Sequence, residues 1–499
     1  MSLAIAASSR PGADEVLGRL RQRGVEAQSL CADSRLVAPG DVFLAYPGAR
    51  SDGRRYLGDA VRRGAAAVLW EAEEADCAVP VAIPGFAVSG LRDLAGPLAH
   101  RVYGRPSERL WVVGVTGTNG KTSVSQWIAQ CMTRLGRKCA VIGTLGSGYP
   151  DRLRAGLNTT PDAISLQRDL AGFVAEGAAA CAMEVSSIGL DQGRVAGVAF
   201  AVAVLTNLTL DHLDYHGSME AYGAAKRRLF AMPGIGAAVL NLDDPYGVDV
   251  AQRLAASGIE RIGYSLEAAR GDCTDRTLFA RDLDFAGHGL RFTVDGVAFA
   301  APLVGRFNVS NLLAVIGALL AGGVSLADAA AAIAAVEAPP GRMQALGGRG
   351  EPLLVVDYAH TPDALEKALL TLRDTAQTRG GRLLCVFGCG GERDHAKRPV
   401  MGGIAVRHAD GVWITSDNPR GENPAAIIGE ILAGTGGEPD VEIDRGAAVA
   451  AAVAAAAAAD VVLVAGKGHE AYQEMAGVRQ AYSDVEQALA ALAAWRSRR

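Results

Sequence analysis

The chain has 499 residues, and a length of about 150 residues per domain predicts about three domains. Its residues are 49% hydrophobic and 21% charged, which excludes a disordered or fibrous protein. The net charge of −5 gives no sign of a basic surface for nucleic acid or anionic membranes, although local arginines can still bind an anionic substrate.

The cysteines and the chain start indicate a reducing compartment. The eight cysteines are scattered without a Cys-x-x-Cys pair, and Cys385 and Cys389 are the closest two. We expect free, buried thiols. Residues 1–15 lack the basic segment and long apolar run of a signal peptide, and Asp460 ends the alanine tract at 447–459 before it reaches membrane-spanning length. The expected location is the cytoplasm, without a membrane span.

The first region, residues 1–90, alternates short helices and strands. Strands are expected at 41–48 and 65–71, and a helical pattern follows at 91–104. The segment "RPSE", whose proline interrupts regular structure, precedes the next apolar strand, so the sequence places a boundary within 88–108. We take residues 1–90 as the first domain.

A regular alternation of strands and helices then predicts a central domain over residues 91–338. Short apolar runs rich in Val, Ala and Leu suit strands that are buried on both faces of a parallel sheet. The expected strands lie at 110–115, 138–144, 179–187, 200–208 and 236–244.

A Pro/Gly break, "EAPPGRMQ" at 337–344, opens a third α/β domain over 339–499. The alanine tract at 447–459 has the composition of a helix. Strands are expected at 352–360, 382–391, 411–419 and 461–469. The fold class is therefore α/β with three domains.

A glycine-rich loop joins the expected strand at 110–115 to a helical pattern. It reads GVTGTNGKTS over 114–123, and its glycines fail the G-x-x-x-x-G-K-[ST] pattern of a Walker A motif. Its position still suits an anion, because backbone N–H groups and a helix N-terminus face the same point. We expect Lys121 to reach the β- and γ-phosphates and Thr122 to offer its hydroxyl to Mg²⁺.

Three more residues are candidates for the chemistry. Glu184 ends an apolar strand, where a carboxylate can hold a hard cation. His212 follows the strand end "TNL"; a lone histidine is otherwise a structural residue, but ligands of open α/β sheets bind at this end of the strands. By composition alone, Lys226 in "YGAAKRRLF" belongs to a solvated helix face with the two arginines that follow it.

The loop form TGTNGKT resembles the phosphate loop of the Mur ligase family, which includes folylpolyglutamate synthetase. Further motifs follow in family order and span nearly the whole chain: DSRLVAPGDVF (33–43), LNTTPD (157–162), MEVSSIGLDQGR (183–194), TNLTLDHLDYHG (206–217), YGAAKRRLF (222–230), GRFNVSN (305–311), GRM (341–343), DYAHTPDAL (357–365), GCGGERDHAKRP (388–399), DNPRGENP (417–424) and GKGHE (466–470). The resemblance implies a central P-loop-type, parallel-sheet ATPase domain between an N-terminal UDP-binding domain and a Rossmann-like C-terminal domain.

The resemblance is closest to the members that add the third residue to UDP-N-acetylmuramoyl-L-alanyl-D-glutamate in peptidoglycan precursor synthesis. It implies that ATP phosphorylates the D-glutamyl γ-carboxylate and that meso-diaminopimelate attacks the acyl phosphate, with Mg²⁺ as cofactor. The implied ATP contacts are Gly114, Thr116, Gly117, Thr118, Asn119, Gly120, Lys121, Thr122, Ser123, Asn308, Arg342, Asp357 and His360. The implied catalytic or metal-binding residues are Lys121, Thr122, Glu184, His212 and Lys226, with Lys226 carbamylated by CO₂.

The resemblance also implies residues for the other two substrates. The implied contacts to the UDP-muramoyl-peptide are Ser34, Asn158, Thr159, Thr160, Ser186, Gln192 and Arg194, with looser matches at Ala49, Arg50 and Ser51. The family usually has a histidine where this chain has Ile188, so that residue's role is not carried over. The implied diaminopimelate contacts are Arg393, Asp417, Asn418, Pro419, Arg420, Gly466 and Glu470.

The motif DNPR distinguishes the diaminopimelate-adding members from the L-lysine-adding members, which are the nearest alternative. Arg420 is the candidate partner for the second carboxylate of diaminopimelate, which lysine lacks. Asp417 and Asn418 would meet the ammonium and orient the turn. An arginine buried without a partner is costly, so we expect diaminopimelate to be favoured by about 10⁴-fold or more.

Two further alternatives differ in function. A folate polyglutamate ligase lacks a comparable UDP-binding domain, which the DSR segment indicates here. A nucleotide switch without ligase chemistry would not need Glu184, His212 and Lys226 together. We expect small-molecule partners only, no nucleic acid, and a monomer, although no motif reports the oligomeric state.

Overall fold

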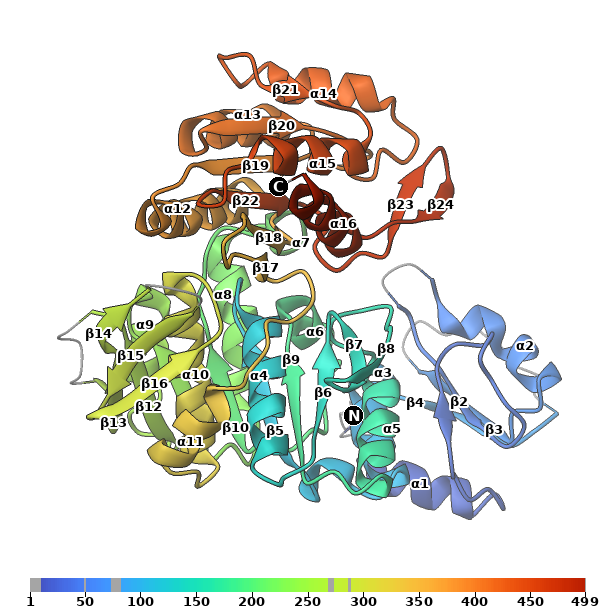
Figure 1. Ribbon diagram of the computed structural model, residues 1–499. Coiled ribbons are helices and arrows are strands. Elements are labelled where there is room, and N and C mark those ends of the chain that lie inside the picture. Colours follow the sequence, from blue (N-terminus) through green and yellow to red (C-terminus); the bar gives the residue numbers. More distant parts are fainter. Residues whose placement is uncertain (1–9, 49–50, 73–81, 268–272, 286–288, 499) are drawn as a thin grey trace. The chain divides into compact units, whose positions relative to one another are not determined.

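The computed structural model describes residues 10–48, 51–72, 82–267, 273–285 and 289–498 (Figure 1). The chain forms two compact units, which are described separately. The first comprises Met1–Gly263, Gly271–Arg276 and Gly317–Gly323, and the second comprises Tyr264–Arg270, Thr277–Ile316 and Val324–Arg499. The weak substrate candidates Ala49 and Arg50 lie outside the described residues, as do residues 1–9 of the expected chain start.

The first unit begins with a four-stranded parallel sheet in the order β1-β2-β3-β4. Its strands are β1 (Leu30–Cys31), β2 (Val42–Ala45), β3 (Ala67–Glu71) and β4 (Gly85–Val88), with helices α1 (Ala13–Arg21), α2 (Leu57–Arg62) and α3 (Leu91–Val102). Leu91 and Leu98 of α3 are buried in one core with Val42 and Leu69 of this sheet. The expected helix at 91–104 is therefore confirmed, and it packs on the first sheet.

A nine-stranded sheet, which lies mostly in the first unit, carries the phosphate loop. Its nine strands run in the order β13-β12-β11-β10-β5-β9-β6-β7-β8. Their bounds are β5 (Trp111–Thr116), β6 (Cys139–Gly143), β7 (Gly146–Tyr149), β8 (Arg152–Arg154), β9 (Ala180–Glu184), β10 (Val202–Leu205), β11 (Ala237–Asn241), β12 (Glu260–Ser265) and β13 (Arg276–Phe279). Strands β11, β10, β5, β9 and β6 are parallel, and their buried Val, Ala and Leu side chains confirm the expected buried strands.

Helices accompany this parallel sheet as the sequence predicts. They are α4 (Lys121–Arg134), α5 (Ala163–Ala175), α6 (Ser187–Asp191), α7 (Leu213–His216), α8 (Met219–Arg227) and α9 (Pro245–Arg253) (Figure 1). Strand β5 is central, and its neighbours β9 and β10 come later in the chain on opposite sides of it. Ligands of such sheets bind at the carboxyl ends of strands where the order reverses, so the segments after β5, β9 and β10 are brought together.

The second unit contains a three-stranded antiparallel sheet, a six-stranded sheet and a hairpin. The small sheet has β14 (Arg281–Asp284), β15 (Leu290–Val294) and β16 (Val297–Ala301). The larger sheet has the order β17-β18-β22-β19-β20-β21, with β17 (Gln344–Gly347), β18 (Leu353–Asp357), β19 (Leu383–Phe387), β20 (Gly411–Ile414), β21 (Asp440–Val441) and β22 (Val461–Ala465). Only β17 in this sheet is antiparallel to its neighbour, among the residues described.

Helices cover both faces of the six-stranded sheet (Figure 1). One face packs on α12 (Pro362–Arg379), α13 (Lys397–His408) and α14 (Pro424–Leu432), and the other packs on α15 (Arg445–Ala455) and α16 (Asp484–Ser497). The remaining elements are α10 (Arg306–Ala321), α11 (Leu326–Ile333) and the hairpin β23 (Tyr472–Met475) and β24 (Val478–Ala481). The mixed α/β architecture with parallel sheets is confirmed, and α15 confirms the helix expected from the alanine tract.

Two expectations, one about thiols and one about membrane-spanning helices, can be compared with the structure. Cys31, Cys131, Cys139, Cys181, Cys273, Cys385 and Cys389 are free, and all but Cys273 are buried. Burial raises the pKa of the Cys131 thiol to about 12, which keeps it protonated and unreactive. Within the described part of the chain, every helix is too short or too polar to cross a membrane.

Candidate active site

The phosphate loop is held against the segment that follows β10. The N–H of Thr118 donates to the carbonyl of Asn207 at 2.9 Å, and the N–H of Asn119 donates to the side-chain oxygen of Asn207 at 2.9 Å. Thr206 Oγ1 donates to the carbonyl of Asn119 at 2.6 Å. Gly117 has a φ of 149°, and a methyl group there would overlap the Thr206 hydroxyl. Glycine is therefore required at this point of the loop.

Two lysines converge on one carbonyl of this loop. Lys121 Nζ lies 2.9 Å from the carbonyl oxygen of Gly117, and Lys226 Nζ lies 2.7 Å from the same oxygen. Lys226 is only 1% exposed, and its ammonium lies 4.4 Å from the centre of the Tyr222 ring. Burial, helped by the charge of Lys121, lowers the pKa of Lys226 well below its usual value. The solvated helix face suggested by composition is therefore wrong for Lys226.

The two arginines after Lys226 behave as the composition suggested. Arg227 pairs with Asp249 at 3.5 Å, and Arg228 pairs with Asp191 at 3.1 Å. Both side chains remain partly exposed. They are surface ion pairs, which contribute little to stability.

Glu184 lies at the end of β9 with its carboxylate buried beside Thr144. Its Oε1 accepts the Thr144 N–H at 2.8 Å, and its Oε2 accepts the Thr144 hydroxyl at 3.1 Å. A methyl group on Gly143 would lie 2.8 Å from both Cγ and Cδ of Glu184. A carboxylate with these two bonds keeps free lone pairs, so it can still bind a cation.

His212 caps the short helix α7 with a φ of 52°, in the left-handed region. Its Nε2 lies 3.5 Å from Asp211 Oδ2, and its ring lies 6.0 Å from that of Tyr222. None of its described side-chain contacts is with Glu184. Among the residues that the structure describes, no three His, Cys, Asp or Glu side chains gather as a metal site. The role of His212 at a second metal therefore stays a prediction.

The other phosphate-loop candidates occupy three environments. Gly114 lies inside β5, where a methyl group would meet Phe200 at 2.8 Å, so the structure gives this glycine a packing role. Thr116 ends β5 and is buried. Thr122 and Ser123 lie in the first turn of α4, and Thr122 is 5% exposed. Thr122 therefore stands at the helix N-terminus, where a phosphate-bound cation is expected.

The candidates for the muramoyl-peptide form a connected group after β9. Thr160 Oγ1 donates to the carbonyl of Glu184 at 3.0 Å and lies 3.1 Å from the Ser186 hydroxyl. Arg194 donates to the carbonyl of Thr160 at 2.8 Å and, through two nitrogens, to the side-chain oxygen of Gln192. The group is continuous with Glu184 through Thr160, and its contact with the muramoyl-peptide stays a prediction.

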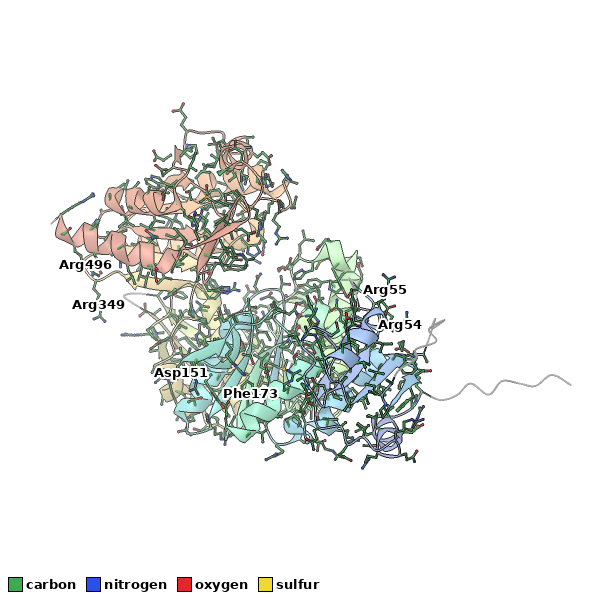
Figure 2. The ribbon with its side chains drawn as sticks, turned by 90° about the vertical axis from the view of Figure 1, so that its right-hand side faces the viewer. Arg54, Arg55, Asp151, Phe173, Arg349 and Arg496 are labelled. Carbon is green, nitrogen blue, oxygen red and sulfur yellow. The ribbon has the colours of Figure 1, made fainter. Side chains whose placement is uncertain are left out.

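The remaining candidates for the muramoyl-peptide lie outside this hydrogen-bonded group. Asn158 is exposed, while Thr159 contacts the Thr144 hydroxyl at 3.1 Å. Ser34 is 9% exposed in the turn after β1. Arg54 and Arg55 come shortly after the weak matches at 49–51 (Figure 2). Arg54 makes an ion pair with Asp52 at 2.7 Å.

Ile188, which stands where the family usually has a histidine, is partly buried in α6. Its neighbour Ser187 is 1% exposed, and the Ser187 hydroxyl lies 3.0 Å from His216 Nε2. Burial lowers the pKa of His216, which favours the neutral ring beside this hydroxyl.

The DNPR turn of the second unit is built around a closed group of polar side chains. Asn418 Nδ2 donates to Glu470 Oε2 at 2.7 Å, and Lys467 Nζ donates to Asn418 Oδ1 at 2.9 Å and to Glu470 Oε2 at 3.0 Å. Lys467 is 0% exposed. Asn418 Oδ1 also accepts the N–H of Glu474 at 2.9 Å, so both of its lone pairs are used and none is left for a substrate ammonium. Its expected role in orienting the turn stays a prediction.

Asp417 is buried against Gly466, where a methyl group would lie 2.6 Å from its Oδ2. Burial raises the pKa of this carboxyl, and Arg445 and Lys467 partly oppose the effect. Arg445 is itself fully buried and bonded to Asp484 at 2.7 and 2.8 Å. Two buried cations, Arg445 and Lys467, therefore favour the ionised form of Asp417 against the effect of its burial on the pKa.

Arg420 differs from the buried, unpaired arginine that the sequence argument assumed. It is partly exposed, its φ is 53°, and its Nη1 donates to the carbonyl of Gly391 at 2.6 Å. The guanidinium thus has a backbone partner and is only partly buried, although the preceding Pro419 is buried. Arg393 is exposed on the neighbouring loop.

The nucleotide candidates of the second unit lie mostly around the end of β18. Asp357 Oδ2 accepts the N–H of Met343 at 2.8 Å, and burial raises the pKa of Asp357. Arg342 lies 4.8 Å from the centre of the Tyr358 ring. His360 Nδ1 lies 2.8 Å from the carbonyl of Tyr358, which places the hydrogen on Nδ1.

Asn308, in α10, is bonded within its own segment. Its Nδ2 donates to the carbonyl of Val304 at 2.7 Å, and its Oδ1 accepts from Asn311 at 3.1 Å. A nucleotide contact for this residue and for the others stays a prediction.

Sequence reasoning missed several residues that shape the site. From the sequence alone, Thr206 and Asn207 indicated only that His212 follows a strand end. In the structure, both residues hold the phosphate loop through hydrogen bonds to Asn119. Lys467 lies in the quoted GKGHE motif, but only its neighbours were selected. The signal available in the sequence was a lysine flanked by two glycines directly after an apolar strand.

Three family descriptions match the chain. "Mur ligase family, catalytic domain" matches residues 26–103, "Mur ligase middle domain" matches residues 115–319, and "Mur ligase, glutamate ligase domain" matches residues 341–468.

Curated relatives are similar over nearly the whole chain. A protein of Ectopseudomonas mendocina (strain ymp) named UDP-N-acetylmuramoyl-L-alanyl-D-glutamate–2,6-diaminopimelate ligase is 51% identical over 484 residues, covering 95% of this chain and 96% of its own. The protein of the same name from Pseudomonas aeruginosa is 52% identical over 485 residues, covering 95% and 96%.

Solved structures agree with the fold. A structure of UDP-N-acetylmuramoyl-L-alanyl-D-glutamate–2,6-diaminopimelate ligase has a TM-score of 0.68 and 36% identity, covering 94% of this chain and 96% of that chain. The MurF ligase of Thermotoga maritima, solved with ADP, has a TM-score of 0.62 at 18% identity, covering 95% and 98%, and supports the fold alone.

Proposed function

Because this chain belongs to the Mur ligase family, we propose that it is the ATP-dependent ligase that adds meso-diaminopimelate to UDP-N-acetylmuramoyl-L-alanyl-D-glutamate. The observation that carries the proposal is the identity of 51% and 52% to two curated ligases of this name over 95% of the chain. The product is a peptidoglycan precursor. Lys121, bonded to the Gly117 carbonyl of the phosphate loop, supplies a cation of the kind that such a phosphoryl transfer requires.

The proposed reaction has two steps. The γ-carboxylate of the D-glutamyl residue attacks the γ-phosphorus of ATP, the bond to the β–γ bridging oxygen breaks, and ADP leaves. The amine at the L-centre of diaminopimelate then attacks the acyl carbon, loses a proton and expels phosphate. Both steps bring anions together, so catalysis rests mainly on positioning and charge stabilisation. Lys121 is proposed to bind the transferring phosphoryl group, which its position at the N-terminus of α4 supports.

The residues fit the implied Mg²⁺. Thr122 offers a hydroxyl at the helix N-terminus, and Glu184 offers a buried carboxylate with free lone pairs, both hard oxygen ligands. When bound, Mg²⁺ neutralises phosphate charge. His212 is proposed for a second metal position.

Lys226 is proposed to carry a carbamate. A lysine attacks CO₂ only as the neutral amine, and the lowered pKa of Lys226 favours that form. Nitrogen bonds to the CO₂ carbon, one N–H proton is released, and a side chain with one negative charge results. The carbamate keeps one N–H, which is enough for the bond to the Gly117 carbonyl. The new anion would be balanced by Lys121.

The remaining site assignments are proposals of the same kind. The three domains, 1–90, 91–338 and 339–499, would bind the UDP-peptide, ATP and the amino acid respectively. The connected group of Thr160, Ser186 and Arg194 supports a peptide site beside Glu184. The cytoplasmic location and the monomeric state remain predictions.

The choice of amino acid is proposed to depend on Arg420. Its Nη1 binds the Gly391 carbonyl, and the other guanidinium N–H groups can bind the second carboxylate of diaminopimelate. Because Arg420 is partly exposed, water can replace that carboxylate when lysine binds. We therefore expect a kcat/KM preference above about 10²-fold but below the about 10⁴-fold of fully buried polar sites.

A ligation assay with purified protein tests the proposed function and the preference for diaminopimelate over lysine together. ATP and UDP-N-acetylmuramoyl-L-alanyl-D-glutamate are supplied with either meso-diaminopimelate or L-lysine, and ADP and product are measured. We expect ADP release to depend on both other substrates and the product to form with diaminopimelate. Comparable kcat/KM for the two amino acids would favour the lysine-adding alternative, and ATP turnover independent of both would favour a nucleotide switch. Arg420→Ala should lower the preference for diaminopimelate.

A further inference from the structure

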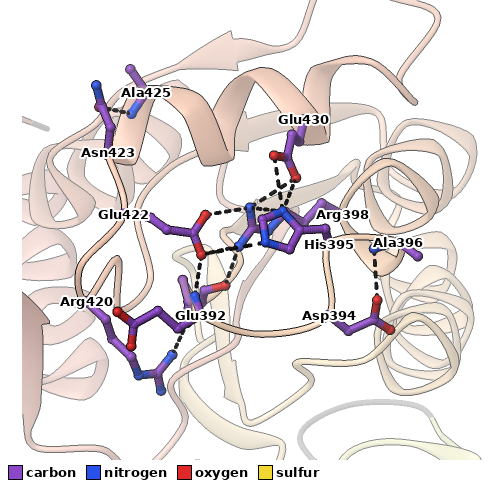
Figure 3. A network of polar contacts seen from close by, with 12 residues as sticks. Glu392, Asp394, His395, Ala396, Arg398, Arg420, Glu422, Asn423, Ala425 and Glu430 are labelled. Atoms are coloured by element: carbon purple, nitrogen blue, oxygen red, sulfur yellow. Dashed lines mark hydrogen bonds and ion pairs between the residues drawn. The ribbon is translucent and has the colours of Figure 1, made fainter.

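Arg398, in the first turns of α13, is a fully buried arginine with three carboxylate contacts (Figure 3). Its Nη1 and Nη2 donate to the two oxygens of Glu422, each at 2.9 Å, and Nη1 also donates to Glu430 at 3.0 Å. A bidentate pair fixes direction as well as charge. The Arg398 guanidinium lowers the pKa of Glu422 to about 2, so Glu422 stays ionised.

This pair also holds the backbone of the loop that precedes α13. Arg398 Nη2 donates to the carbonyl of Gly390 at 3.1 Å, and Glu422 Oε1 accepts the N–H of Glu392. The loop continues to Arg393, one of the candidate diaminopimelate contacts. Arg398 and Glu422 thus bind this loop at residues on either side of Gly391.

The same stretch of loop touches the DNPR turn. The N–H of Gly391 donates to the carbonyl of Asn418 at 2.9 Å, and the carbonyl of Gly391 accepts Arg420 Nη1 at 2.6 Å. A methyl group on Gly391 would overlap the carbonyl of Pro419. Glu422 lies two residues after Arg420 and accepts the N–H of Glu392, so it connects the turn and the loop (Figure 3).

Glu430 provides an internal comparison. It lies on α14, and its described contacts are with Arg398 and His395. It makes an ion pair with Arg398 at 3.0 Å, as Glu422 does at 2.9 Å. Its described contacts reach neither the Gly390–Glu392 backbone nor the DNPR turn. Both glutamates therefore bind Arg398, but among the described contacts only Glu422 also binds the backbone of the loop.

We propose that Arg398 is a positioning residue of the amino-acid site: through Glu422 it locks the Gly390–Arg393 loop to the Asn418–Arg420 turn and so aims Arg420 at the second carboxylate of diaminopimelate. The inference rests on the proposed function and extends it to residues that do not touch the substrate. Binding groups work only within about 0.5 Å of their productive positions, and a shift of about 1 Å can cost about 10²-fold. A partly exposed arginine on a turn depends on such support.

The matched variants Glu422→Gln and Glu430→Gln test the proposal, since each removes one ion pair with Arg398. For Glu422→Gln we expect KM for meso-diaminopimelate to rise about tenfold or more, with KM for ATP changed by less than about twofold. For Glu430→Gln we expect KM for meso-diaminopimelate to change by less than about threefold. Thermal unfolding is measured for both, and similar losses would show that stability does not explain the difference.

A third variant, Arg398→Lys, keeps the charge but loses the two parallel hydrogen bonds. It should raise KM for meso-diaminopimelate as Glu422→Gln does; if it does not fold, the two glutamine variants decide alone. Equal KM increases in Glu422→Gln and Glu430→Gln, or no increase in either, would overturn the proposal. A wild-type protein that makes no diaminopimelate product would instead refute the proposed function, and the inference would fall with it.

Discussion

The substitution Gly143→Ala tests whether the carboxylate of Glu184 must lie where the structure places it. Gly143 ends β6 and packs directly on the Glu184 side chain, without contributing a side chain of its own. The new methyl group would lie 2.8 Å from Cγ and Cδ of Glu184, whereas ordinary contacts begin at 3.4 Å, and it would overlap Oε1. Because Glu184 is 1% exposed and held by Thr144, it cannot turn away without losing those bonds.

The expected loss follows from this displacement. The side-chain carbons must move by about 0.6 Å and the carboxylate oxygen by more, and a misplacement of about 1 Å costs about 10²-fold in rate. We therefore expect kcat to fall by about 10- to 10²-fold and the Mg²⁺ concentration for half-maximal rate to rise. Overpacking of this kind also destabilises the fold by about 1–3 kcal/mol.

The assay measures ADP release against Mg²⁺ concentration, with circular dichroism and thermal unfolding of the same samples. The matched control is Gly172→Ala in α5, where a methyl group would meet no heavy atom within 4 Å. Its activity should equal that of the wild type, and its stability should rise by up to about 1 kcal/mol because alanine favours helix. A folded Gly143→Ala protein with wild-type kcat and an unchanged Mg²⁺ requirement would refute the assignment of Glu184.

The other predictions concern the two lysines on the Gly117 carbonyl. Lys121→Ala should keep its circular dichroism spectrum and lose about 10²-fold or more in kcat, as expected when a charge-stabilising donor is removed; near wild-type kcat would remove the phosphate-loop assignment. Lys226→Ala should be inactive and partly restored by a short carboxylic acid in the buffer; an active variant, with unmodified lysine in the intact mass of active wild type, would contradict the carbamate. In CO₂-free buffer, the lowered folded-state pKa of Lys226 means that the unfolded chain binds more protons between the folded and unfolded pKa values. The free energy of unfolding should therefore increase as pH rises through that window and decrease as pH falls. Lys226→Met removes this group, so the slope of Tm against pH should be smaller in the variant than in the wild type. An identical slope in both proteins would count against a neutral amine at Lys226.

The sequence by itself determined the α/β class and the positions of most strands, because buried parallel strands require short apolar runs. β6, β9, β10, β11, β18, β19, β20 and β22 lie within the expected stretches, and β5 runs one residue past the end of its stretch, to Thr116. It also determined that a phosphate loop begins α4 and that Glu184 stands at a strand end, since both depend on neighbours in the chain. The motif order indicated the family, which the comparisons confirm.

Only the tertiary structure decided which charged residues are buried and what they bind. Lys226 follows a helical pattern with two more cations, so local composition predicts exposure; its burial arises because α8 packs where the loop after β5 presents the Gly117 carbonyl. Arg398 and Glu422 are 24 residues apart, and Asn418 and Lys467 are 49 apart. Contacts at such separations depend on how strands and helices pack, and no spacing rule along the chain encodes them. For the same reason Arg420 was expected to be buried, although its turn leaves it partly exposed to water.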